Sequence, residues 1–188
     1  MAADIAIDRK TPVAFTNVLP AQIQEELAGR DLPLILNSTP GVYATQQGGG
    51  DGDARVTIRG FDQTNLAVMV DGVPMNDMEN GWVYWSNWAG LDIVVRTTQV
   101  QRGLGASKLA IPSVGGTINI LTGGDESGNG RLTFLSEVGN YGYFRNSLSG
   151  VFGNREKGFL HFVGSYRTNQ GFAAGLESEA YALSLIHI

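Results

Sequence analysis

The sequence contains no cysteine, and this absence excludes disulfide bonds, thiolate metal ligands and a cysteine nucleophile together. Charge is scarce as well, because 16% of the 188 residues are charged, whereas about 25% is usual in soluble domains. No apolar run approaches the ~18 residues that a membrane-spanning helix requires. If this protein meets a membrane, it must therefore do so with β-strands.

Signs of nucleic-acid binding and of secretion are also missing. The formal net charge is −5 and the 13 Lys and Arg residues form no basic cluster, which argues against a nucleic-acid surface. The first ten residues, MAADIAIDRK, contain no apolar core of a signal peptide. We therefore expect that Met1 is not the native start of the protein.

No recognisable catalytic set is present. His161 lies inside a strand-like pattern and His187 near the end of the chain, and no G-x-S-x-G nucleophile elbow accompanies them. The run GLGASK at 103–108 lacks the glycine and lysine spacing of a phosphate-binding loop. We predict that the protein is not an enzyme and has no cofactor.

A metal site has equally little support. GGGDGD at 48–53 is similar to one turn of a calcium-binding β-roll, but such folds need several copies. Asp71, Asp77 and Glu79 could offer oxygen ligands to a hard cation. Carboxylates beside turns are more often solvated, so we predict no metal site.

Glycine, in contrast, is in excess and punctuates a series of short elements. Its 26 residues are about twice the ~7% expected, which indicates many turns and close backbone contacts in a β-rich fold. A short helix is predicted from Pro20 to Gly29, and a second after it with Asp31 as N-cap and Pro40-Gly41 as its stop. Strands are predicted at 56–59, 66–70, 94–102 and 116–122.

A different pattern begins after the Gly/Asp/Ser-rich linker at 123–130. Three successive runs of roughly 9–11 residues alternate apolar and polar side chains, as tilted transmembrane β-strands do. An ordinary antiparallel meander with one buried face needs the same alternation, and periodicity alone favours that interpretation. The residues that form the apolar face are Leu132, Phe134, Val138, Phe144, Leu148, Phe152, Leu160, Phe162 and Tyr166.

The run ENGWVYWSNWAG at 79–90 concentrates aromatic side chains in a loop-like setting. One interpretation is a small core patch beneath the loop, which we expect for Trp88. The other is a recognition surface, because exposed Trp and Tyr offer rigid contact area with a polar group. Alternation would point Trp82 and Tyr84 one way and Trp85 the other, so both interpretations stay open.

Four short motifs now carry a family resemblance. They occur in the order and spacing of the plug domain of TonB-dependent outer-membrane receptors, which the sequence resembles over about residues 11–122. DRKTPVAF and MENGWVYWSNW look most like the Bacteroidetes branch of that family. The four motifs are VTIRGF at 56–61, VMVDGVPMND at 68–77, VQRGLGAS at 100–107 and SVGGTINILT at 113–122.

The resemblance implies an α+β plug domain with a small mixed sheet, followed by antiparallel strands that begin a 22-stranded transmembrane β-barrel. A barrel of that size cannot close within 188 residues, so a fragment is expected. The last six residues follow no barrel pattern and are suspected to be a sequencing artefact. The expected parts are an extended segment with a remnant of the TonB box (1–10), the plug (11–122), the linker (123–130), the first barrel strands (131–182) and the suspect tail (183–188).

By the same resemblance, the protein would sit in the outer membrane of a Gram-negative cell, with the plug in the barrel lumen. It would import a scarce nutrient of the siderophore, cobalamin, glycan or peptide class. Its implied partners are TonB with the ExbB/ExbD energy complex, outer-membrane lipid, the ligand and a surface lipoprotein. The alternative is a secreted or surface β-rich binding or structural domain, which would not explain four motifs in register.

The resemblance also assigns roles to particular residues. Arg59 and Arg102 would face glutamates of the barrel wall and lock the plug in place. The loops at about 46–53, 61–65 and 75–88 would face the substrate. The substrate-facing candidates are Gln63, Asn65, Asn76, Trp82 and Tyr84, and the candidates for contact with TonB are Asp4, Ile5, Ala6 and Ile7.

Overall fold

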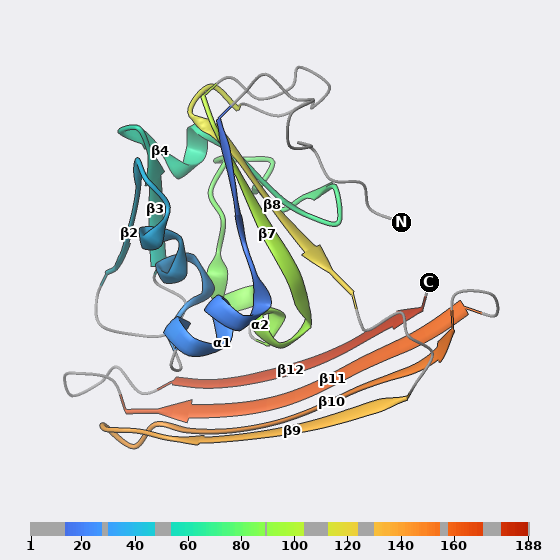
Figure 1. Cartoon of the computed structure of the whole chain (residues 1–188). Helices are drawn as coiled ribbons and strands as arrows, with labels where there is room; N and C mark the ends of the chain where they lie inside the picture. The colour runs from blue at the N-terminus through green and yellow to red at the C-terminus, as the bar shows by residue number, and fades with distance from the viewer. Residues whose placement is uncertain are drawn as a thin grey trace. The chain divides into compact units, whose positions relative to one another are not determined.

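The chain divides into two compact units, which are described separately below. Unit 1 comprises residues 1–45, 54–84 and 95–122, and unit 2 comprises residues 46–53, 85–94 and 123–188. Figure 1 shows the secondary structure of this computed structural model. The structure describes residues 14–27, 30–47, 54–88, 90–103, 113–123, 130–154, 158–170 and 178–187.

Unit 1 contains a mixed five-stranded sheet. β5 (Leu66–Val70) runs parallel to β8 (Gly116–Thr122), and the other neighbours are antiparallel. The predicted strands 66–70 and 116–122 coincide with β5 and β8. The complete order is β1 (Phe15–Val18), β7 (Val95–Arg102), β8, β5 and β6 (Val73–Pro74).

A smaller three-stranded sheet joins β2 (Val42–Gln46), β3 (Ala54–Ile58) and β4 (Phe61–Asp62) in that order. β3 ends at Ile58 and not at the predicted residue 59. Arg59 and Gly60 have φ angles of 53° and 83°, so they form a two-residue hairpin turn between β3 and β4. Two successive positive φ angles suit the right-handed twist of paired strands, which explains why the strand stops there.

The helices of the chain are short. α1 (Pro20–Leu27) matches the first predicted helix, but the second is the 3-10 helix η1 (Leu32–Ser38). Asp31 stands at the N-cap of η1 without capping it, because its carboxylate accepts a hydrogen bond from the backbone N–H of Ala54 at 3.3 Å. The others are η2 (Gln63–Asn65), η3 (Trp85–Trp88) and α2 (Leu91–Val94).

In the described parts of the chain, no helix is both long enough and apolar enough to cross a membrane.

The core of unit 1 lies on both faces of its central strands. All residues of β5 except the last are buried, and so are all residues of β8 except the last. A strand covered on both faces reads as a continuous apolar run, as LAVMV does in β5. On β8, Ile118 and Ile120 alternate with the equally buried Thr117 and Asn119, so one of its covered faces is polar.

Unit 2 contains a four-stranded antiparallel meander, in the order β12-β11-β10-β9 (Figure 1). Its strands are β9 (Arg131–Val138), β10 (Phe144–Asn154), β11 (Gly158–Asn169) and β12 (Ser178–His187). β12 pairs with β11 as far as His187, which stands opposite Leu160. Residues 183–187 of the suspect tail are thus part of a strand.

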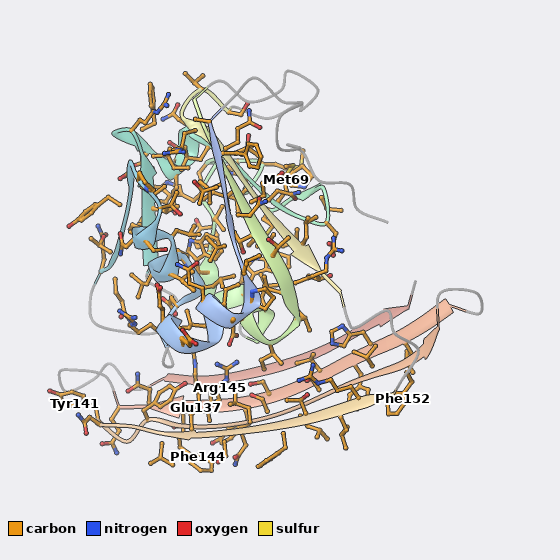
Figure 2. All side chains as sticks on the ribbon, in the orientation of Figure 1. Met69, Glu137, Tyr141, Phe144, Arg145 and Phe152 are labelled. Carbon is orange, nitrogen blue, oxygen red and sulfur yellow. The ribbon has the colours of Figure 1, made fainter. Side chains whose placement is uncertain are left out.

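The polarity of this meander is the reverse of that expected in a soluble protein. The side chain of Arg145 is 3% exposed, whereas Phe144 beside it is 38% exposed. Figure 2 shows these two side chains on opposite faces of the strands. Ser147, Ser149 and His161 are buried as well. All but one of the exposed apolar residues of these strands share the face of Phe144, the exception being Leu135, which stands opposite Ser147. These residues are Leu132, Phe134, Leu135, Val138, Phe144, Leu148, Phe152 and Leu160.

β10 has an exposed apolar face opposite a covered polar face, which is the pattern of a transmembrane β-strand, whereas β9 is exposed on both faces. An ordinary meander buries its apolar face. The exposures therefore favour the first of the two interpretations that the alternation left open.

Candidate functional site

The turn between β5 and β6 is formed by Asp71 and Gly72, whose φ angles are 50° and 82°. The carboxylate of Asp71 accepts hydrogen bonds from Thr122, one from its backbone N–H at 2.9 Å and one from its hydroxyl. The backbone N–H of Asp71 donates to the carbonyl of Ile120 at 2.9 Å. Asp71 thus joins the ends of the parallel strands β5 and β8, and is not free for a cation.

Residues 75–88, the aromatic loop, follow this hairpin, and Asn76 holds their first part in place. Its Oδ1 accepts from the backbone N–H of Val68 at 2.9 Å, and its Nδ2 donates to the carbonyls of Leu66 and Gly81, both at 2.9 Å. The amide that we expected to face a substrate therefore bonds to the backbone of unit 1. Asn76 shapes the loop from within.

Asp77 closes the next turn of the aromatic loop. Its Oδ1 accepts from the backbone N–H groups of Glu79 at 2.9 Å and Asn80 at 3.0 Å, and its carbonyl accepts from Gly81 at 2.9 Å. This is how an Asp side chain stabilises a turn locally. Among the described residues, no group of three or more His, Asp or Glu side chains could hold a metal ion.

In unit 1 the aromatic loop presents two aromatic side chains. The Trp82 ring is covered on one side by Arg55, whose Cζ lies 3.8 Å from the ring centroid, a cation–π contact. Tyr84 is 49% exposed, and its hydroxyl accepts from Nδ2 of Asn80 at 2.8 Å. Each of the two side chains thus has one neighbour that orients it, and Tyr84 is open to solvent.

In unit 2 the aromatic loop continues as η3, and here one expectation is wrong. Trp88 is 39% exposed, whereas Trp85 is 5% exposed and forms the core patch. The expected alternation is present, because Val83 and Trp85 are buried and Tyr84 is exposed. The sequence showed the alternation but not which indole lies beneath the loop.

The remaining substrate-facing candidates lie at the β4–η2 turn. Gln63 is 2% exposed, so its side chain is inside the unit and not on its surface. Asn65 is exposed, and its carbonyl accepts from the backbone N–H of Gly115 at 3.1 Å. Asp62 caps η2 by accepting from the N–H of Thr64 at 3.1 Å. This turn therefore presents Asn65 and covers Gln63.

The structure places the side chain of Arg59, the first predicted latch residue, beside the residue that follows Arg102. Nη1 of Arg59 lies 3.0 Å from the point where a Cβ on Gly103 would stand. Gly103 directly follows Arg102 in the sequence. Arg102 donates to the carbonyl of Pro40 at 3.0 Å and to the hydroxyl of Thr16 at 3.4 Å. Arg102 therefore connects β7, β1 and the end of η1. No carboxylate among the described residues pairs with either arginine, so their contact with barrel glutamates stays a prediction.

The TonB-contact candidates Asp4, Ile5, Ala6 and Ile7 lie outside the described residues. Residues 48–53 of the first predicted substrate loop do so as well, and so do most of GLGASK and of the linker. The roles expected for these segments stay predictions.

A charged network in unit 2 was not predicted from the sequence. Nη2 of Arg145 lies 2.8 Å from Oδ2 of Asp92, and Nη1 lies 3.4 Å from Oε2 of Glu137. Nε of Arg145 donates to Ser147 at 3.2 Å. The alternation placed Arg145 on the polar face of its strand. It could not reveal a partner in α2, 53 residues away in the sequence.

Tyr143 completes this network from the turn between β9 and β10. Its hydroxyl donates to Oε2 of Glu137 at 3.1 Å. Burial, and next the negative charge of Glu137, raise the pKa of Tyr143 to about 12. The phenol therefore keeps its proton at physiological pH and remains a donor to the carboxylate. Glu137 is thus shared between Tyr143 and Arg145.

A mixed-sheet domain with glycine turns and hydrogen-bonded loops is followed here by strands of inverted polarity, an arrangement that fits a membrane receptor with a plug and a barrel. Residues 8–117 match the family described as TonB-dependent Receptor Plug Domain. The chain belongs to this family. Because the family is one of outer-membrane transport receptors, the prediction that the chain is not an enzyme is confirmed.

Individual relatives agree with this assignment. The chain is 30% identical over 161 residues to the vitamin B12 transporter BtuB of Vibrio vulnificus, covering 85% of this chain and 26% of the relative. The BtuB protein of Vibrio cholerae is 28% identical over 160 residues, again with 26% of the relative covered. The chain thus spans about a quarter of the length of these curated relatives. Both come from Vibrio, so the resemblance to the Bacteroidetes branch stays a prediction.

Solved structures show the same fold. The alcaligin outer-membrane receptor FauA from Bordetella pertussis superposes with a TM-score of 0.70 at 18% identity, over 96% of this chain and 30% of that one. The siderophore receptor PirA from Pseudomonas aeruginosa gives a TM-score of 0.67 at 22% identity, over 95% of this chain and 32% of that one. These matches extend beyond the plug into the strands of unit 2.

Proposed function

We propose that this chain is the N-terminal part of a TonB-dependent receptor that binds a scarce nutrient and imports it across a Gram-negative outer membrane. In this proposal unit 1 is the plug, and β9–β12 begin a 22-stranded barrel. The observation that carries the proposal is a plug-family match followed directly by strands with an exposed apolar face. A secreted or surface β-rich domain would account for neither.

The arrangement follows from the physics of a wide barrel. Side chains fill the interior of an eight-stranded barrel, but a 22-stranded barrel leaves a lumen that a separate folded domain must plug. Opening that plug takes work, which TonB with ExbB/ExbD would supply by pulling on the segment around residues 4–7. Arg59 and Arg102 would pair with glutamates of the barrel wall and hold the plug in the lumen until TonB pulls on it.

For the substrate, we propose a bulky metal chelate of the cobalamin or siderophore class. The support is that the sequence relatives are vitamin B12 transporters and that the solved structures with the same fold include siderophore receptors. Asn65, Trp82 and Tyr84 would contact the ligand through amide and aromatic groups. Gln63 and Asn76 would act indirectly, by holding the backbone of their loops.

Removing the aromatic side chains of Trp82 and Tyr84 tests this role. In the complete receptor, Trp82→Ala and Tyr84→Ala are each expected to weaken ligand binding about 10-fold or more, because rigid, well-packed aromatic residues often dominate a binding surface. Titration calorimetry with cyanocobalamin and a panel of ferric siderophores first identifies the ligand that wild-type receptor binds, and then compares the variants.

Tyr43→Ala is the matched control, because Tyr43 is an aromatic residue of unit 1 that is 66% exposed but lies outside the aromatic loop. Its affinity should equal that of wild type. If Trp82→Ala and Tyr84→Ala also bind like wild type, the aromatic loop has no part in recognition.

A further inference from the structure

The aromatic loop belongs to both compact units. Residues 75–84 are part of unit 1, and residues 85–94, which contain η3 and α2, are part of unit 2. The chain thus passes from unit 1 to unit 2 between Tyr84 and Trp85, and returns between Val94 and Val95. The whole excursion nevertheless lies within the match to the plug family at residues 8–117. A segment of plug sequence is therefore structurally part of the strand unit.

The secondary structure of residues 85–94 does not by itself explain why this segment packs in unit 2. α2 has four residues and η3 also has four, and helices of that length are unstable without tertiary contacts. Trp85, Leu91 and Val94 are buried and supply non-directional contacts. A directional contact is needed to fix the segment at one position on the strands.

Asp92 and Arg145 supply that contact. Their side chains are 15% and 3% exposed and their charged atoms lie 2.8 Å apart. Removing one partner of such a covered pair leaves the other charged and without compensation, which is far more costly than losing an exposed ion pair. The pair is therefore a strong constraint on where Asp92 can be.

The position of Arg145 in the sheet explains why a further carboxylate is favourable beside it. Arg145 stands directly opposite Glu137 of β9 on one side and directly opposite Arg167 of β11 on the other. Like charges opposite each other on adjacent strands repel, whereas unlike charges attract. Glu137, Arg145 and Arg167 thus carry one negative and two positive charges across three strands. Asp92, which is not part of the sheet, supplies the second negative charge.

We propose that Arg145 is a positioning residue for the aromatic loop. Acting through Asp92, it keeps residues 85–94 with strands β9 and β10, while Trp82 and Tyr84 remain with unit 1. If the proposed function holds, Arg145 thereby fixes Trp88, the exposed indole of this segment, on the strands that begin the barrel.

Amide hydrogen exchange of the complete receptor in nanodiscs, without any ligand, tests the anchor. In Asp92→Asn and in Arg145→Gln, exchange within residues 85–94 is expected to be at least 10-fold faster than in wild type. Exchange within β5 (Leu66–Val70) should be unchanged. Arg145→Lys keeps the positive charge but not the forked geometry, so its exchange should lie between wild type and Arg145→Gln.

Asp62→Asn is the matched control, because it removes one negative charge from unit 1 and leaves a side chain that still caps η2. Protection of β10 amides shows that the sheet is intact in every variant, and Asp92→Asn tests the anchor without altering a strand. Wild-type exchange of residues 85–94 in Asp92→Asn would overturn the proposal, as would equal acceleration in β5. Because no ligand is present, this outcome is independent of the binding test of Trp82 and Tyr84.

Discussion

Gly116→Ala is expected to destabilise unit 1 by about 3 kcal/mol, through backbone strain and overpacking together. Gly116 has a φ angle of +153°, and a Cβ there would stand 2.4 Å from the carbonyl oxygen of Gln101 on the paired strand β7. That oxygen is backbone within the sheet and cannot move without breaking β7 from β8. Since a typical domain is stable by only about 5–15 kcal/mol, the loss is large.

The free energy of opening of β7 and β8, measured by hydrogen exchange on the complete receptor, checks this prediction. Gly60→Ala is the matched control, because Gly60 also has a positive φ angle, 83°, but a Cβ there would meet nothing within 4 Å. Only the cost of placing a Cβ in the left-handed region, about 1–2 kcal/mol, then applies. If Gly116→Ala and Gly60→Ala lower the free energy of opening equally, the contact with Gln101 is not what requires glycine at position 116.

The second large effect is expected from a charge on the apolar face of the strands. Leu148 lies in the middle of β10 and is 41% exposed. If its side chain faces lipid, Leu148→Arg places a cation near the bilayer midplane, at a cost of about 2–4 kcal/mol. Folded receptor in the outer membrane, measured by heat-modifiable gel mobility, should fall to a small fraction of the wild-type amount.

Thr133→Arg is the control for this substitution. Thr133 of β9 stands opposite Ser149, on the face of the strands that bears the polar side chains. Thr133→Arg also replaces a neutral residue with arginine, but on the proposed lumen side. The amount of folded receptor in the outer membrane should therefore be near that of wild type. A reversed order, with Thr133→Arg more damaging than Leu148→Arg, would mean that the faces are assigned wrongly.

Much of the fold could be predicted because its signals are local. The apolar run at 66–70 and the pair Asp71-Gly72 specify a strand and a hairpin turn within a few residues, and both are present. Arg59 was placed in the strand before it because β propensity alone does not reveal a positive φ angle. Asp31 occupies the predicted N-cap, but its carboxylate is used by Ala54, 23 residues later in the sequence.

The candidate site was less predictable, because one side chain can serve either a ligand or the backbone. Asn76 and Gln63 look like surface amides in the sequence, yet the first bonds to three backbone groups of its own unit and the second is buried. Arg145 and Asp92 meet only because the chain leaves unit 1 at Trp85 and returns at Val95. No local pattern encodes such a contact.

The central claim, that β9–β11 turn one face to lipid and the other to a plugged lumen, is tested most directly by scanning thiol accessibility. The chain has no cysteine of its own, so single cysteines can be placed at Phe134 and Leu148 on one face and at Thr133 and Ser147 on the other. The complete receptor is then labelled in native outer membranes with a lipid-soluble and a water-soluble maleimide. The account predicts that positions 134 and 148 react only with the lipid-soluble reagent, and that positions 133 and 147 do not react with it. Efficient labelling of positions 134 and 148 by the water-soluble reagent would contradict it.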